Sequence, residues 1–269
     1  MKQMSIGMYY PVATYLHQLD GRVKVITMMM VMTVLFFSSN FWIYGLIFSC
    51  LLGLIVHARL PLKGFNGIAS LRFIFVLTFF LSVFLVPGER ILFEWHWIYG
   101  TVEGLRIGLV LVIRIILMLF TTTILTMTTT PFQLTSALAF LLSPLQKMGL
   151  PVAEGTLMVN LALRFVPTLM EEKDRIINAQ KARGANFEEG GILKKAKSII
   201  PVLIPLIISS FKRADDLALA MEARCFKIGK SRTNYRRLKM THKDYKILLV
   251  ILLLMLMMMA LEIRLRSFL

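Results

Sequence analysis

Long apolar runs alternate with short polar breaks along this chain, and the pattern predicts a membrane protein built from helices. A helix needs about 20 apolar residues to cross the hydrocarbon core of a bilayer, and somewhat fewer when flanking side chains reach toward the interface. Five segments meet this requirement. They are Val23 to Phe37, Phe41 to Val56, Ile68 to Val86, Gly104 to Thr130 and Ile247 to Ile263.

The first two segments are separated only by Ser38-Ser39-Asn40. These three polar residues could form a tight reversal between two helices, or a polar break in one long kinked helix. We favour two helices. The fold class expected from the whole pattern is therefore an all-α membrane protein with about five transmembrane helices.

The distribution of Lys and Arg predicts the orientation, because positively charged connections stay in the cytoplasm. Arg22 and Lys24 hold the N-terminus inside, and Arg59, Lys63 and Arg72 place the second connection there as well. The connection PGERILFEWHWIYGTVEG is rich in Trp and Glu, as expected for an outer interfacial loop. This orientation places Arg264 and Arg266 on the outer side of the membrane, against the tendency of positive charges to stay in the cytoplasm. Two charges at a C-terminus have little influence on orientation.

Residues 131–246 carry about twice as many Lys and Arg as Asp and Glu, which predicts one large cytoplasmic region. We therefore divide the chain into residues 1–130, with an N-terminal cytoplasmic segment and the first four spanning helices, a cytoplasmic part 131–246, and a last spanning helix in 247–269. The middle part is too polar to span and too apolar for a solvated loop, so it must lie against another surface.

Three helices are expected in this cytoplasmic part, the first from about Phe132 to Met148. The next two are amphipathic, with apolar residues on one stripe and charged residues nearly opposite. The kinks that Pro201 and Pro205 should cause fall near the start of the last helix. The stripe residues expected to contact membrane or a partner are Met158, Leu161, Phe165 and Leu169 on the first amphipathic helix, and Leu203, Ile207 and Met221 on the second.

Both amphipathic helices end in the same short motif. The first ends at Ala182-Arg183 with Gly184 in the position of a left-handed cap, and the second at Ala223-Arg224-Cys225. An Arg near a helix C-terminus complements the helix dipole by about 0.3–1 kcal/mol, so either motif alone is explained by capping. Because the motif occurs twice in one compartment, the chain presents two similar cationic tips, which suit a partner with two similar acidic grooves.

The composition narrows the function. The formal charge of +16 would suit nucleic acid on a soluble body, but in a chain with 57% hydrophobic residues it fits loops held at an anionic cytoplasmic leaflet. Cys50, Cys225 and the four His show no metal-ligand spacing and no disulfide framework. We expect no nucleic-acid partner, no metal and no cofactor.

The run from Ala179 to Phe226, with KARGA and MEARC separated by IIPVLIPLIISSFKRADDLALA, resembles the transmembrane T component of energy-coupling factor (ECF) transporters. YYP and LDGRVK near the N-terminus share the likeness, which extends over nearly the whole chain. Two positions depart from the family pattern: Cys225 replaces Gly, which predicts a less tightly left-handed second cap, and Gly21 stands where Pro is expected.

The resemblance implies a non-catalytic scaffold in the plasma membrane of a prokaryote. Its Ala-Arg-Gly-type helix ends would dock on two ABC ATPase subunits through Ala182, Arg183, Gly184, Ala223, Arg224 and Cys225. Its apolar stripes would hold a separate substrate-capturing S component, for uptake of a vitamin or a metal ion.

Two other function classes remain open. A membrane enzyme, such as an intramembrane protease or a lipid transferase, needs a buried nucleophile, a metal cluster or an Asp-rich site, and the sequence offers none. A secondary transporter predicts inverted repeats with broken helices at the membrane centre, whereas the two Arg motifs repeat within one compartment. Arg114, inside the fourth apolar segment, is a functional residue, extends its side chain toward the interface, or is paired within the bundle.

Overall fold

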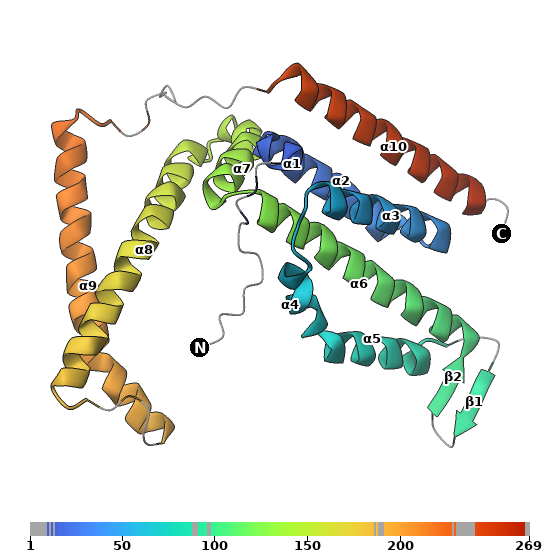
Figure 1. Cartoon of the computed structure of the whole chain (residues 1–269), viewed down its shortest axis with the longest axis horizontal. Helices are drawn as coiled ribbons and strands as arrows, with labels where there is room; N and C mark the ends of the chain where they lie inside the picture. The colour runs from blue at the N-terminus through green and yellow to red at the C-terminus, as the bar shows by residue number, and fades with distance from the viewer. Residues whose placement is uncertain are drawn as a thin grey trace. The chain divides into compact units, whose positions relative to one another are not determined.

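The computed structural model describes residues 10, 12, 14–87, 91–95, 98–185, 187, 191–227, 229 and 240–266. The chain is predominantly helical and folds into two compact units (Figure 1). Unit 1 comprises residues 1–138 and 237–269, and unit 2 comprises residues 139–236. This division follows packing within the chain, so the expected three-part division across the membrane stays a prediction.

Unit 1 begins with the single turn α1 (Tyr15–Gln18) and the helix α2 (Gly21–Phe37). The carboxylate of Asp20 accepts a hydrogen bond of 2.9 Å from the backbone N–H of Arg22, which caps the start of α2. Ser38 is in extended conformation, and the next helix, α3 (Phe41–His57), starts after Asn40. Ser38-Ser39-Asn40 is therefore a connection between two separate helices, as favoured from the sequence.

The longest helix of unit 1 is α6 (Val102–Thr128), which packs against α2, α3 and α5 (Arg72–Leu85) (Figure 1). The hydroxyl of Thr101 accepts a hydrogen bond of 3.0 Å from the N–H of Gly104 and caps α6. Close approach of α5 requires glycine on α6: a Cβ at Gly104 would lie 2.8 Å from the carbonyl oxygen of Ser82. Small residues spaced by four are a common contact between helices in membranes, and Gly104 and Gly108 supply one here.

Arg114 of α6 is paired inside the bundle. Its guanidinium donates to the carbonyl of Ser38 over 2.7 Å and to the hydroxyl of Tyr44 over 3.1 Å, and Tyr44 is almost fully buried. This pairing places Arg114 at the connection between α2 and α3, where it satisfies a carbonyl left over at the end of α2. Of the roles that the sequence leaves open for Arg114, the contacts therefore show pairing within the bundle.

The last helix, α10 (His242–Arg266), is joined to this connection by a carboxylate. Glu262, which is 5% exposed, accepts hydrogen bonds from the hydroxyl of Ser38, the N–H of Ser39 and the side-chain amide of Asn40, at 2.9–3.1 Å. At the other end of the bundle, the ammonium of Lys24 donates to the carbonyl of Thr128 over 2.8 Å. These two clusters connect α2, α6 and α10 at their ends.

The third apolar segment differs from its prediction as one helix from Ile68 to Val86. Its helix, α5, begins only at Arg72, after the 3₁₀ turn η1 (Leu62–Phe65) and the single turn α4 (Asn66–Ala69). Phe65 is buried and stacks on Phe120 of α6 with ring centroids 5.0 Å apart. Ile68, the first residue of the predicted helix, packs against the same core, so η1 and α4 lie against α6 and the straight helix begins only after them.

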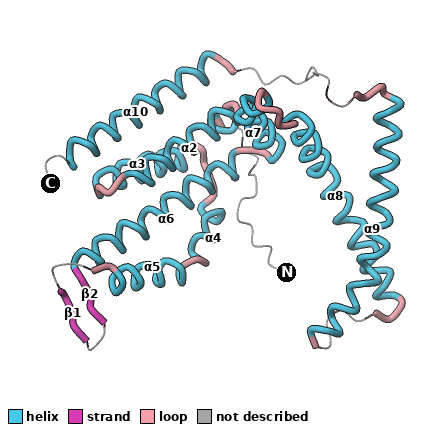
Figure 2. Tube along the Cα trace, turned by 180° about the vertical axis from the view of Figure 1, so that it is seen from behind, coloured by secondary structure: helices cyan, strands magenta, loops and turns pink. Residues whose placement is uncertain are grey.

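The outer loop expected between the third and fourth segments contains a short antiparallel hairpin (Figure 2). Its strands are β1 (Ile91–Trp95) and β2 (Ile98–Thr101), with an irregular register between Ile91 and Phe93. Isoleucine and aromatic residues, which favour strands, fill both segments. This stretch is a connection, as predicted from the sequence, but its two strands were not predicted.

Two described helical segments, Val102–Thr128 and Asp244–Arg264, are long and apolar enough to cross a membrane. The apolar helices α3 and α5 have 17 and 14 residues. At 1.5 Å per residue they extend about 21–26 Å, which is shorter than a hydrocarbon core of about 30 Å. The expected number of five spans therefore stays a prediction, which requires local thinning or flanking side chains that reach the interface.

The helix α7 (Pro131–Gln146) crosses the boundary between the units, and unit 2 continues with α8 (Val152–Ala182) and α9 (Ile192–Ala223). The helices α8 and α9 pack against each other. The ribbon of α9 bends in its N-terminal half, where Pro201 and Pro205 each remove a backbone donor (Figure 1). These three helices match those expected from the sequence, with ends shifted by a few residues.

Candidate functional site: two arginine-ended helices in unit 2

The C-terminus of α8 forms a complete Schellman cap. Gly184 has a φ of +85°, and its N–H donates to the carbonyl of Lys181 over 3.0 Å. The N–H of Ala185 donates to the carbonyl of Gln180, also over 3.0 Å. Both bonds satisfy carbonyls that would otherwise lack partners at the helix end. Arg183 is the last residue before the chain turns, so the left-handed cap predicted at Gly184 is confirmed.

The C-terminus of α9 has the same cap with a different residue. Cys225 has a φ of +57°, its N–H donates to the carbonyl of Glu222 over 2.8 Å, and the N–H of Phe226 donates to Met221 over 3.0 Å. Because Cys replaces Gly, the sequence predicts a less tightly left-handed turn here, and that prediction is wrong. The two hydrogen bonds hold a non-glycine residue in the left-handed region, at a cost of about 1–2 kcal/mol.

Arg183 and Arg224 therefore occupy equivalent positions, each directly before a left-handed residue. Both side chains are exposed, as are Ala182, Gly184, Ala223 and Cys225. Neither guanidinium forms a hydrogen bond or ion pair with a described residue. An exposed guanidinium keeps all five of its donors available for a carboxylate.

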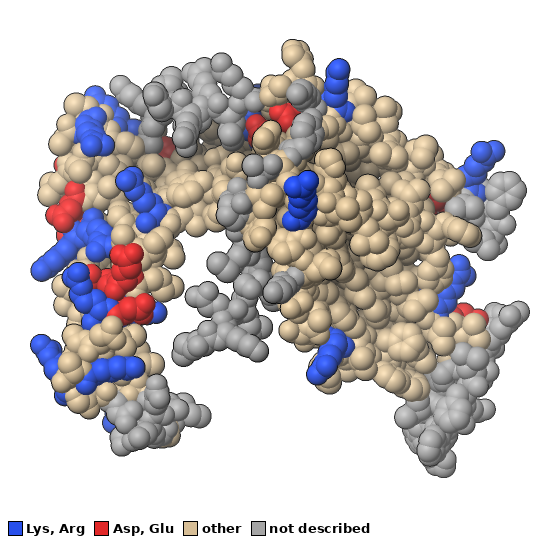
Figure 3. Space-filling view, in the orientation of Figure 1, with Lys and Arg blue, Asp and Glu red and all other residues tan. Residues whose placement is uncertain are grey.

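The surface around these helix ends is strongly charged. Lys, Arg, Asp and Glu gather along α8 and α9 on the face shown in Figure 3, whereas the shown face of unit 1 is mostly tan with scattered charged groups. The two helix ends thus belong to the polar part of the molecule. Within the described residues, no group of three or more His, Cys, Asp and Glu is placed to hold a metal ion.

The predicted apolar stripes divide into two sets in the structure. Phe165 and Leu169 of α8 line a small cavity of 160 Å³ together with Ala214 and Leu217 of α9, so part of each stripe packs against the other helix. Leu161 and Met221 are half-buried. The exposed members of the predicted set are Met158, Leu203 and Ile207.

The exposed apolar face of α9 is wider than the sequence analysis predicted. Ile200, Ile204, Ile208 and Phe211 are each at least half exposed and follow one another at helical spacing of three or four. On a helix of 100° per residue they lie beside Leu203 and Ile207, turned away from Leu217. The run IIPVLIPLII carried this signal, because it is apolar on more of the helix than the contact with α8 requires.

The geometry defines a class of protein: a helical membrane protein with a second unit that exposes two equivalent cationic helix ends and an unpartnered apolar face. A family model described as "Cobalt transport protein" (CbiQ) matches residues 13–235. The chain is 39% identical to the "Energy-coupling factor transporter transmembrane protein EcfT" of Ruminiclostridium cellulolyticum, with 91% of each chain covered. It is 40% identical to the protein of that name from Thermosediminibacter oceani, covering 91% of this chain and 92% of the relative.

The protein of the same name from Bacillus subtilis is 38% identical over 93% of this chain and 94% of the relative. The chain belongs to this family of transmembrane proteins of energy-coupling factor transporters. The resemblance given by KARGA and MEARC is thereby confirmed.

Proposed function

We propose that this chain is a coupling scaffold that transmits ATP-driven movement of two ABC ATPase subunits to a substrate-binding S component in the same membrane. The observation that carries the proposal is the equivalence of Arg183 and Arg224. Two identical caps present two exposed guanidinium groups in one unit, which supports docking on two similar partner subunits.

Each arginine would bind an acidic groove of one ATPase. Charge-assisted hydrogen bonds of this kind contribute about 1.5–3 kcal/mol each when partly buried. Two such contacts on one scaffold reinforce each other, because the second forms at a high effective concentration once the first has formed. The caps make each tip rigid, so movement of the ATPase is passed to the whole helix.

The exposed apolar residues of α8 and α9 would contact the S component or the membrane. Met158, Leu203 and Ile207 are exposed, and the neighbouring isoleucines of α9 extend the surface. An aliphatic face has no hydrogen-bond pattern to match, so it suits a coupler that recognises its partner by shape. Phe165 and Leu169 line the cavity against α9, and Leu161 and Met221 are half-buried, so these four would contribute less to the contact.

The N-terminus and unit 2 lie in the cytoplasm in this proposal, and the membrane is the plasma membrane of a prokaryote. The chain has no catalytic role of its own, since the partner ATPases hydrolyse ATP. Vitamins or metal ions are the transported class, and the S component selects among them. We find no observation that favours a membrane enzyme or a secondary transporter.

The proposal is tested by affinity purification of the full chain from its native membrane without crosslinking. Two ATPase subunits and one small membrane protein should purify with it in fixed ratio. A chain that purifies alone and transports or converts a substrate by itself would refute the proposal.

A further inference from the structure

Unit 1 contains an apolar cavity of 290 Å³ between α1, α2, α3, α6 and α10. Aliphatic side chains from all five helices form most of its wall. Leu16, Met28, Leu54 and Ile251 line it and remain partly exposed, so the cavity reaches the surface of unit 1. Cavities that bind small ligands typically measure about 300–1,000 Å³, so this one lies just below the lower end of that range.

Two of the three threonines in the wall have hydroxyl groups that are already hydrogen-bonded within their own helix. The hydroxyl of Thr121 donates to the carbonyl of Leu117 over 2.8 Å, and that of Thr128 donates to the carbonyl of Ile124 over 2.8 Å. Both groups are thus satisfied within α6. A cavity with such a wall does not retain water, so its occupant must be apolar over most of its length.

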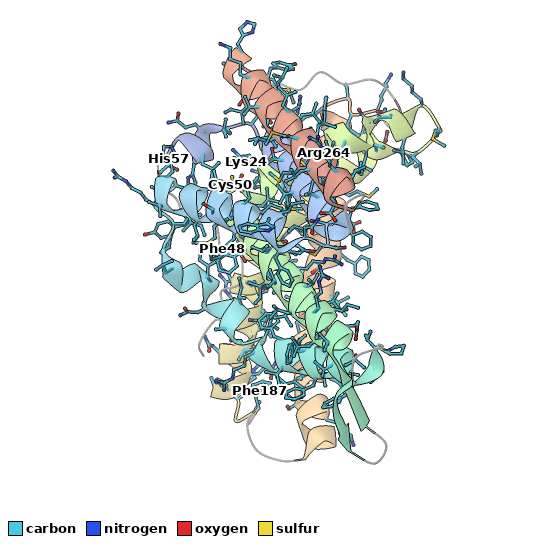
Figure 4. The ribbon with its side chains drawn as sticks, turned by 90° about the vertical axis from the view of Figure 1, so that its right-hand side faces the viewer. Lys24, Phe48, Cys50, His57, Phe187 and Arg264 are labelled. Carbon is cyan, nitrogen blue, oxygen red and sulfur yellow. The ribbon has the colours of Figure 1, made fainter. Side chains whose placement is uncertain are left out.

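One end of the cavity carries nitrogen-bearing side chains. Lys24, near the start of α2, and His57, the last residue of α3, both line it (Figure 4). Lys24 is 7% exposed, and its ammonium donates to the carbonyls of His17 and Thr128, which occupy two of its three N–H groups. No carboxylate among the described residues accepts a hydrogen bond from it. The carboxylate of Asp20 acts on Lys24 electrostatically without a hydrogen bond, and the third N–H of the buried ammonium has no acceptor among the described residues, which favours a further anion there.

We propose that this cavity binds an acyl chain of one anionic phospholipid, with the lipid phosphate beside Lys24 and His57. The apolar wall suits the chain, and the cationic end suits the phosphate. Basic pockets between helices at the cytoplasmic face are suited to anionic headgroups, and the cytoplasmic leaflet is rich in such lipids. In the proposed orientation, the end of the bundle that contains Lys24 faces that leaflet.

The bound lipid would complete the packing of α10. Among the described elements, α10 makes extended contact with α2, and only 6% of its most apolar stretch is buried. Ile247 and Ile251 of α10 line the cavity together with Leu51 and Leu54 of α3. An acyl chain in the cavity would add apolar contacts between α10 and the helices that share its wall, beyond the packing of Met255, Met258 and Met259 against the core.

The test uses the full chain, equilibrated in detergent with equimolar phosphatidylglycerol and phosphatidylcholine and examined by native mass spectrometry. We expect one phosphatidylglycerol to be retained per chain, with about a fivefold preference that corresponds to one nearby cation. Leu54→Trp should fill the cavity and abolish retention. Leu52→Trp is the matched control, because Leu52 is exposed on the same helix and does not line the cavity.

His57→Glu provides an independent variant at an exposed residue, for the case in which Leu54→Trp disturbs the fold. The acidic side chain should reduce the preference for phosphatidylglycerol to near parity. Equal retention of the two lipids by the unaltered chain would overturn the proposal. So would unchanged retention of phosphatidylglycerol in Leu54→Trp, or an unchanged preference in His57→Glu.

Discussion

Gly184 and Cys225 hold the same position in two helix caps: each follows an exposed arginine, has a left-handed φ and donates its N–H to the carbonyl three residues earlier. The equivalence of the two ends is therefore one of backbone geometry as well as of sequence. It places the guanidinium groups of Arg183 and Arg224 on helix ends of identical construction. The proposed docking depends on this construction, so the caps can be tested before the partners are known.

Gly184→Ala should destabilise the end of α8 by about 1 kcal/mol, because alanine is strained at a φ of +85°. The exchange of the Ala185 amide, which donates to Gln180, should then accelerate about fivefold. Cys225→Gly should have the opposite effect on the Phe226 amide. Gly155→Ala is the control, since Gly155 is helical with open space around it and its replacement should stabilise α8. Unchanged exchange in Gly184→Ala would mean that the cap does not hold the helix end.

Glu262→Ala should destabilise unit 1 by about 2–4 kcal/mol, because the donors of Ser38, Ser39 and Asn40 would lose their shared acceptor in a buried position. The thermal midpoint in detergent measures this effect. A cysteine pair across α2 and α10 should also crosslink less readily. Glu222→Ala, at an exposed site of α9, is the control and should leave the midpoint unchanged.

Stability should fall when the pH is lowered through the range in which His17 titrates. Burial, followed by the positive charge of Lys24, holds the pKa of His17 below its usual value of 6.5. Protonation is therefore harder in the folded state than in the unfolded state, so the contribution is complete above pH 6.5 and is lost as the pH falls below it. The thermal midpoint of the unaltered protein should drop between pH 7.5 and pH 5.5, and the drop should be smaller in His17→Gln. Equal drops in both proteins would show that other groups cause the dependence.

Mutations should distinguish the two faces of the amphipathic helices, which are the face packed within the α8–α9 pair and the exposed apolar face. Phe165→Ala removes a side chain that α9 contacts and should loosen the pair by about 1–3 kcal/mol, as expected for a half-buried Phe. Ile207→Asp, at an exposed site, should leave the pair intact and abolish capture of the S component while the ATPases still bind. Hydrogen exchange in α8 and pull-down of each partner distinguish these outcomes. Loss of the ATPases alone in Ile207→Asp would mean that the faces are assigned the wrong way round.

The sequence predicts the parts of this fold that depend on local patterns. Apolar runs predict the helices, prolines predict where helices begin or bend, and the Gly after Arg183 predicts the first cap. The second cap was misjudged because the propensity of Cys225 disfavours a left-handed turn, whereas two backbone hydrogen bonds at that helix end override the propensity.

Long-range contacts explain the other differences. Phe65 stacks on Phe120, which lies 55 positions later in the chain. The sequence of residues 62–72 has no periodicity that predicts a helix beginning only at Arg72. The pairing of Arg114 with Ser38 likewise joins two segments that only the fold brings together. The division of the stripes required the geometry of the α8–α9 pair, because a helical wheel shows which residues share a face and not which neighbour covers it.

The most direct test of the central claim is the double charge reversal Arg183→Glu with Arg224→Glu, followed by co-purification of the ATPases. Docking in acidic grooves would then set like charges against each other at both contacts, a penalty of several kcal/mol. The control is Arg175→Glu with Lys212→Glu, which makes the same change in net charge at exposed sites on the same two helices. We predict that the first variant inserts normally and loses both ATPases, while the control retains them. Normal ATPase recovery with the first variant would contradict the account and leave the two arginines as helix caps alone.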